Sequence, residues 1–297
     1  MGHGEMGWWT KFYGEGFKHE LVKFREIVEG GETNPYRAIN LFQLWEQTHQ
    51  RQYNDGPGTF FYTDKDFTNA ESLFPTGKPV LSSTFLGGEV AKLPYYTKKH
   101  IGLFILDYLE HEDLAVDAIV ELGAGWGRYL FELYFSGSPS DIALVSGEVS
   151  PEARQITEVL CDLDPVMPIT AHDFDFYHPK LDFLKGRESV LFFTHMAIMF
   201  IPELQRQAII EMAASAKRVR CIHFEPVGFQ VSSGQYKATK LQRVAAVDKG
   251  FNRNLIALLE ELHNEDRITL RGLYKDIIFD VDRTQAISVV IWEGGSG

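Results

Sequence analysis

Glu121-Leu122-Gly123-Ala124-Gly125-Trp126-Gly127 is the stretch that decides the fold of this chain. It closes a short apolar run, residues 118–122, and a segment with helical spacing, residues 128–135, follows at once. Glycines between a strand and a helix permit positive φ angles and let a ligand approach the backbone, because no Cβ stands in the way. The stretch predicts a ligand-binding turn, and a purely structural bend is the alternative.

The spacing of the glycines distinguishes between ligands. A dinucleotide-binding turn places its third glycine three residues after the second, where it admits the pyrophosphate and packs the helix. Arg128 occupies that position here, and the pattern is instead E-x-G-x-G-x-G. A nicotinamide-dependent enzyme therefore fits the glycine spacing poorly.

Acidic residues end the next two predicted strands. Glu148 lies in Ser146-Gly147-Glu148-Val149-Ser150-Pro151, about 20 residues after the glycines, where a carboxylate can accept both hydroxyls of a ribose. An acid at a helix N-terminus is also favoured by the helix macrodipole alone. The prediction for Glu148 therefore rests on its spacing from the glycines. The third strand ends in Ala171-His172-Asp173-Phe174.

These motifs resemble those of class I S-adenosylmethionine-dependent methyltransferases. The first motif of that family matches here at all four positions, and the resemblance covers roughly residues 113 to 293. It implies that the glycine turn faces the methionine moiety of S-adenosylmethionine, that Glu148 binds the ribose, and that Asp173 bonds the adenine amino group while Phe174 packs nearby. The implied cofactor-binding residues are Glu121, Gly123, Gly125, Gly127, Glu148, Val149, Asp173, Phe174 and His195.

The pattern from residue 113 onward predicts a matching fold, because short apolar runs alternate with amphipathic segments as in βαβ units. The expected strands are 118–122, 142–147, 167–172, 190–194, 219–225, 268–274 and 286–292. The expected helices are 128–135, 151–161, 202–216, 237–248 and 252–263, with Pro151 and Pro202 in first turns. We expect an α/β, doubly wound, mostly parallel seven-stranded sheet. The resemblance implies that its last two strands form an antiparallel edge pair. Residues 228–265 should be a helical insertion in the cofactor-binding domain, 113–297.

Residues 1–112 form the second predicted region, which is rich in aromatic residues. Helical spacing is visible over residues 17–28, 37–50 and 96–108, residues 54–57 and 74–79 favour turns, and few clean strands are seen. We expect a helical N-terminal cap whose lid side chains are Trp8, Trp9, Tyr13, Tyr95 and Tyr96. Core packing is the competing explanation, because large aromatic side chains dominate cores in any case.

His195 and Glu225 are the candidate catalytic residues, since each ends a predicted strand at the same rim. Methyl transfer requires in-line alignment and exclusion of water, and a hydroxyl or ammonium acceptor also requires a general base. The unperturbed pKa of histidine, near 6.5, suits that role. The alternatives are a backbone hydrogen bond for His195 and, for Glu225, capping of the next segment or pairing with an arginine.

A metal site is not expected. His195, Glu225 and Asp173 combine imidazole with carboxylates, which suits several divalent ions. Metal-dependent small-molecule methyltransferases, however, should carry an acid after the fourth strand and an Asp-Asn pair after the fifth, and neither occurs here.

Composition limits the partners. The 297 residues include 29 Lys plus Arg and 41 Asp plus Glu, a net charge of −12, which argues against nucleic acid and anionic membranes. The longest apolar run, 190–201, is too short to cross a bilayer, which needs about 20 residues. The two cysteines make no disulfide framework and the N-terminus has no signal-peptide pattern, so we expect a cytoplasmic protein.

We therefore expect an S-adenosylmethionine-dependent methyltransferase that acts on an oxygen or nitrogen of a small molecule, such as a specialised metabolite or sugar. The oligomeric state is not predicted. A peptide or protein methyltransferase, a nicotinamide-dependent enzyme and a cofactor-binding scaffold without catalysis are the alternatives.

Overall fold

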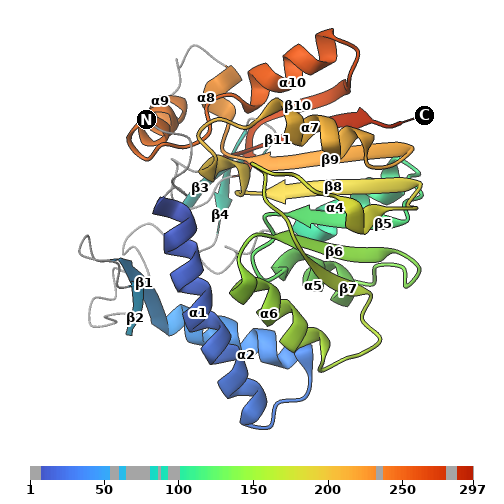
Figure 1. Ribbon diagram of the computed structural model, residues 1–297. Helices are drawn as coiled ribbons and strands as arrows, with labels where there is room; N and C mark the ends of the chain where they lie inside the picture. The colour runs from blue at the N-terminus through green and yellow to red at the C-terminus, as the bar shows by residue number, and fades with distance from the viewer. Residues whose placement is uncertain are drawn as a thin grey trace.

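The computed structural model describes residues 8–53, 60–64, 81–85, 88–92, 101–231, 237–278 and 286–296, and side chains in only part of the N-terminal region. A seven-stranded sheet forms the centre of these residues, with helices on both faces (Figure 1). The α/β class predicted from the sequence is confirmed.

The strands of the central sheet lie in the order β10-β11-β9-β8-β5-β6-β7. Their bounds are β5 (Ala118–Leu122), β6 (Ala143–Glu148), β7 (Ile169–Asp173), β8 (Ser189–His195), β9 (Arg218–Glu225), β10 (Thr269–Ile278) and β11 (Ile287–Gly294). The pairings β5–β6, β6–β7, β5–β8 and β8–β9 are parallel. Strand β11 runs antiparallel to both β9 and β10, so the sheet is mixed and carries the expected antiparallel pair at one edge.

Helices cover the two faces of this sheet separately. On one face lie α4 (Ile101–His111), α5 (Arg128–Phe135) and α6 (Pro151–Cys161), whose buried side chains pack with Ile119 of β5. On the other lie α7 (Arg206–Ala214) and α10 (Leu255–Asn264), which pack with the neighbouring Val120. Because successive side chains of a strand point to opposite faces, β5 contributes to both cores.

Local signals explain where some of these helices begin. Helix α6 starts at Pro151, and the hydroxyl of Ser150 accepts a hydrogen bond from the backbone amide of Ala153, as expected of an N-cap. The prediction that Pro202 opens the next helix is wrong, because α7 begins at Arg206. The carbonyl of Pro202 instead accepts from the backbone amide of Arg253, so tertiary contacts hold this segment outside the helix.

Besides α4, the described residues of the N-terminal region form two helices and two hairpins. Helices α1 (Trp8–Glu29) and α2 (Pro35–Thr48) match predicted helical segments. The hairpins pair β1 (His49–Tyr53) with β2 (Phe60–Asp64) and β3 (Leu81–Phe85) with β4 (Gly88–Lys92), and the sequence did not predict them. Strand β1 reads His-Gln-Arg-Gln-Tyr, which lacks the apolar alternation that marks a half-buried strand. The turns expected at 54–57 and 74–79 lie outside the described residues.

Helices α1 and α2 share a core with the sheet domain. Phe24 and Phe42 are fully buried, and their rings stack with centroids 4.2 Å apart. The ring of Phe24 also meets that of Trp126, from the glycine turn, edge-on at 5.4 Å. The described N-terminal helices are therefore packed on the part of the sheet that carries the glycine turn, and a domain boundary near residue 113 stays a prediction.

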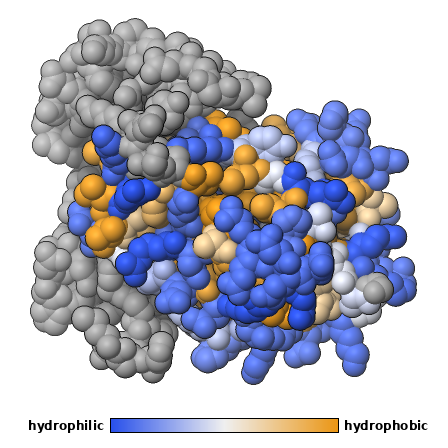
Figure 2. All heavy atoms as spheres, turned by 90° about the horizontal axis from the view of Figure 1, so that it is seen from above, coloured by the Kyte–Doolittle hydropathy of each residue, from blue (hydrophilic) through white to orange (hydrophobic). Residues whose placement is uncertain are grey.

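The segment predicted as a helical insertion contains α8 (Gly228–Val231), α9 (Lys237–Asp248) and α10. Seen from above, hydrophilic residues cover most of the described surface, and several hydrophobic residues gather in the middle of the view (Figure 2). On α8 and α9 the exposed apolar side chains are Val231, Leu241, Val244 and Val247. None of the helices in the described ranges has an apolar stretch long enough to cross a membrane.

Candidate functional site

The glycine turn between β5 and α5 has the left-handed backbone that the sequence predicts. The φ angles of Gly123, Gly125 and Gly127 are +71°, +56° and +77°. At Gly123 a Cβ would also lie 2.5 Å from the Cβ of Ala197, so only glycine fits there. The backbone amide of Gly123 donates to the carbonyl of Gly147 at 2.7 Å, which binds the turn to the end of β6.

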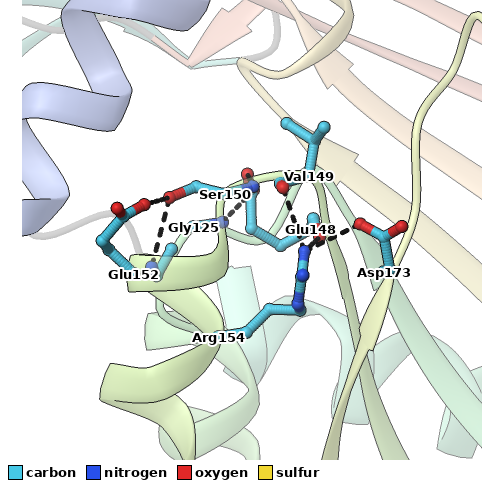
Figure 3. A network of polar contacts seen from close by, with 8 residues as sticks. Gly125, Glu148, Val149, Ser150, Glu152, Arg154 and Asp173 are labelled. Carbon is cyan, nitrogen blue, oxygen red and sulfur yellow. Dashed lines mark hydrogen bonds and ion pairs between the residues drawn. The ribbon is translucent and has the colours of Figure 1, made fainter.

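Glu148 joins the glycine turn directly (Figure 3). Its Oε2 accepts a hydrogen bond from the backbone amide of Gly125 at 2.8 Å, and its Oε1 accepts from the amide of Ser150 at 2.9 Å. Burial raises the pKa of Glu148, although these backbone donors oppose the shift. Each carboxylate oxygen has a second lone pair, so Glu148 can still accept from the hydroxyls of a ligand.

Glu121 adds a second buried acid to this site. Its side chain is buried, and its Oε2 has no hydrogen-bond partner within the described part of the chain. Burial raises the pKa of Glu121 well above its ordinary value, and the charges of Glu148 and Glu132 raise it further. A buried oxygen without a donor is costly, so a ligand with a cationic group is favoured here because it would stabilise the ionised carboxylate, whereas a pyrophosphate would add further negative charge beside the two acids.

Arg154 links the carboxyl ends of β6 and β7 beside Glu148, at the rim of the sheet (Figure 3). Its Nη1 donates to the carbonyls of Glu148 and Val149, at 2.6 and 3.0 Å, and to Oδ1 of Asp173 at 2.8 Å. The side chains of Val149 and Asp173 are exposed at this rim. Phe174 is buried beneath it in the core, with its ring edge-on to Phe176.

Glu225 lies at the carboxyl end of β9 and is fully buried. Its Oε1 accepts from the Thr194 hydroxyl at 2.8 Å and from the backbone amides of Ala197 and Ile198 at 3.0 Å each, and its Oε2 accepts from the amide of Met199 at 3.1 Å. This geometry favours the alternative reading of Glu225, a carboxylate that caps the next segment, over contact with a substrate.

His195 ends β8 and lies at the same edge of the sheet as the glycine turn. Its ring is partly buried and meets that of Tyr129 on α5, with centroids 4.7 Å apart. Parallel strands present their carboxyl ends at one edge, so the topology brings His195, Glu148 and Asp173 to a common rim, as the sequence predicts.

Helix α1 covers the glycine turn. A Cβ on Gly125 would lie 3.2 Å from Cζ of Phe17, and the ring of Tyr13 meets that of Phe200 with centroids 4.9 Å apart. Of the predicted lid residues, Tyr13 is therefore near this edge. The side chains of Trp8 and Trp9 and the whole of Tyr95 and Tyr96 lie outside the described residues.

Several residues of the site were missed by sequence reasoning. They are Arg154, Thr194, His223 and Trp292. Arg154 stands four residues after the Ser150 cap, so helical geometry could have placed it near the start of α6. Thr194 and His223 are cross-strand neighbours, and only the register of β8 on β9 reveals that.

Away from the glycine turn, the described residues offer little for a ligand. In the described ranges, no group of three or more His, Cys, Asp and Glu side chains is arranged to hold a metal ion. A surface hollow lined in part by Ile210, Arg267 and Ser296 lies near the end of β11. Because β11 is antiparallel to β9, that end is opposite to the glycine turn.

Comparisons with known proteins concern the fold. No family model matches the sequence, and no similar protein is found among the curated proteins. One similar structure is the plantazolicin methyltransferase BpumL with a monoazolic desmethylPZN analog and SAH, at 12% identity over 66% of this chain and 82% of that chain, with a TM-score of 0.44. Another is geranyl diphosphate C-methyltransferase from Streptomyces coelicolor A3(2) with Mg²⁺, geranyl diphosphate and S-adenosyl-L-homocysteine, at 10% identity over 66% and 80%, with a TM-score of 0.44. A third is the N-terminal domain of EvdMO1 with SAH bound, at 13% identity over 77% and 95%, with a TM-score of 0.40.

Proposed function

We propose that this chain is an S-adenosylmethionine-dependent methyltransferase that acts on an oxygen or nitrogen of a small molecule. The observation that carries the proposal is the hydrogen bond from the Gly125 amide to Glu148. It places a backbone turn without side chains beside a carboxylate suited to a ribose, at the carboxyl ends of adjacent parallel strands. Open α/β sheets bind nucleotide-type ligands at this edge.

The buried acids of the site fit this cofactor. Glu121 and Glu148 interact electrostatically, and Glu121 has an oxygen without a donor in the described residues. When bound, S-adenosylmethionine supplies a methyl group on a positively charged sulfonium. The resemblance of the motifs assigns the ribose hydroxyls to Glu148, the adenine amino group to Asp173, and the methionine moiety to the glycine turn. A dinucleotide would instead bring its anionic pyrophosphate against the same acids.

The residues that face the acceptor are assigned by position. His195 is the proposed general base, because it ends β8 between the glycine turn and the segment that meets α1. Tyr13 and Phe17 on α1 would help to exclude water from the transfer, which a sulfonium electrophile requires. A turn covered by α1 favours a small acceptor over a peptide bound in an open groove. A cytoplasmic location remains part of the proposal.

Calorimetric titration tests the cofactor assignment. The protein should bind S-adenosylhomocysteine with a saturable one-site isotherm and should give no heat of binding with NAD⁺, because of the glycine spacing and the buried acids. Binding of NAD⁺ without binding of S-adenosylhomocysteine would replace the proposed function with the nicotinamide alternative.

His195→Ala is expected to separate chemistry from cofactor binding. General acid–base catalysis contributes about 10²- to 10⁴-fold, so turnover should fall by that order. The measurement is release of S-adenosylhomocysteine with any acceptor that the wild type methylates. Affinity for S-adenosylhomocysteine should stay within about twofold, since the resemblance places the glycine turn and Glu148, which the substitution leaves intact, on the cofactor. Full activity of the variant would remove His195 from the mechanism.

A further inference from the structure

The segment after β8 has a strained backbone. Met196 has a φ of +52°, which is uncommon for a residue with a side chain and costs about 1–2 kcal/mol. Such strain persists only where the surroundings hold it in place. The segment from His195 to Met199 borders the proposed cofactor site, because the Cβ of Ala197 lies where a side chain on Gly123 would stand.

Glu225 accepts most of the hydrogen bonds that fix this segment in place. Three successive backbone amides, those of Ala197, Ile198 and Met199, all donate to its carboxylate. The amide of Met196 donates to the carbonyl of Phe224, the neighbour of Glu225 in the chain. None of the ion pairs among the described residues includes Glu225, so backbone amides and the Thr194 hydroxyl take the place of a cation.

A chain of buried hydrogen bonds continues from Glu225 across three strands. The Thr194 hydroxyl is 3.0 Å from Nδ1 of His223, and Nε2 of His223 is 2.9 Å from Nε1 of Trp292. Since the indole can only donate, Nε2 accepts and the proton lies on Nδ1, which donates to Thr194. Burial lowers the pKa of His223 to about 3, so the ring is neutral. Thr194, His223, Glu225 and Trp292 are all fully buried, so the chain is shielded from water.

We propose that Glu225 is a positioning residue that, with Thr194, His223 and Trp292, holds the segment 195–199 against the glycine turn and so shapes the proposed cofactor site. This inference rests on the proposed function only for the identity of the ligand. The buried carboxylate is required because it supplies acceptors alone, whereas an amide would turn a donor toward one of the backbone N–H groups.

Glu225→Gln tests, without ligand, whether the Glu225 carboxylate fixes the segment 195–199. Hydrogen exchange followed by NMR should show the Met199 amide exchanging at least tenfold faster, since Met199 is the donor to Oε2 among the described residues. The matched control is Asp117→Asn, because the carboxyl of Asp117 also accepts from successive backbone amides, those of Glu188 and Ser189, but at the opposite end of β8. That control should leave the exchange of residues 197–199 unchanged. Unchanged exchange in Glu225→Gln would overturn the proposal.

Affinity for S-adenosylhomocysteine tests the consequence. It should fall at least fivefold in Glu225→Gln, because the segment 195–199 would no longer be held against the glycine turn, and stay unchanged in Asp117→Asn. Burial raises the pKa of Glu225 to about 7, so acidification from about pH 8 to about pH 6 should weaken binding more in the wild type than in Glu225→Gln. The ionisable groups that face Glu225 within its chain of contacts are His223, which stays neutral, and Cys221, whose pKa burial raises.

The outcomes separate the two proposals. If the wild type fails to bind S-adenosylhomocysteine, the proposed function fails, and hydrogen exchange still decides whether Glu225 holds the segment. If exchange rises while affinity and its pH profile match the wild type, the positioning role is overturned. Should Glu225→Gln not fold, Thr194→Val removes the hydroxyl bonded to Glu225 and His223, and the same two measurements apply to it.

Discussion

Gly123→Ala is expected to destabilise the protein by about 2–5 kcal/mol, combining about 1–2 kcal/mol for a left-handed alanine with about 1–3 kcal/mol for overpacking. The first contribution follows from the φ of +71°. The second follows from the contact of 2.5 Å with the Cβ of Ala197. Chemical denaturation would measure the loss. The same clash should push the segment after β8 away from the turn and abolish binding of S-adenosylhomocysteine.

Gly137→Ala is the matched control for that prediction. Gly137 also has a positive φ, +92°, but a Cβ there would meet nothing within 4 Å. Only the backbone contribution of about 1–2 kcal/mol should therefore appear, and ligand binding should persist. Equal losses in the two variants would show that Ala197 does not press on the turn.

Glu148→Gln should weaken binding of S-adenosylhomocysteine by about 10- to 150-fold, because a hydrogen bond to a charged group contributes about 1.5–3 kcal/mol. The amide also turns a donor toward either Gly125 or Ser150, whose backbone N–H groups now donate to the two carboxylate oxygens. The melting temperature should change little in comparison, because removing a buried charge offsets the mismatched hydrogen bond. Calorimetric titration and thermal unfolding measure the two effects.

Glu152→Gln is the control for the effect at Glu148. Glu152 lies in the first turn of the same helix and accepts from the Ser150 hydroxyl at 3.1 Å, but it makes no bond to the glycine turn. Its substitution removes one negative charge near the site, and affinity should stay within about twofold because water and salt screen a charge that is only partly buried. Similar losses in both variants would point to general electrostatics instead of a specific contact by Glu148.

Sequence reasoning predicted best the elements whose signals are local. Residues 118–122, 128–135 and 151–161 form elements with the expected bounds, since glycines, a serine cap and Pro151 mark their ends. The start of α7 was misplaced because the carbonyl of Pro202 bonds the distant Arg253, which no local pattern reveals. The four short N-terminal strands were not predicted for a related reason. They pair with one another, but their sequences lack the alternating apolar pattern of a half-buried strand.

In the candidate site, too, some features were predictable from the sequence and others were not. The proximity of Glu148 to the glycine turn was predictable, because parallel strands align their carboxyl ends. The surroundings of Asp173 and Glu225 were not. Asp173 is paired with Arg154, and Glu225 is enclosed by backbone amides of the following segment. Both arrangements depend on strand register and on helix packing, which residue spacing does not specify.

A crystal structure with S-adenosylhomocysteine bound tests the central claim most directly. The account predicts ligand density along the glycine turn, with the ribose hydroxyls within hydrogen-bond distance of Glu148 and the amino-acid end beside Glu121. Density at any other edge of the sheet, or a glycine turn and Glu148 left without ligand under saturating conditions, would contradict the account.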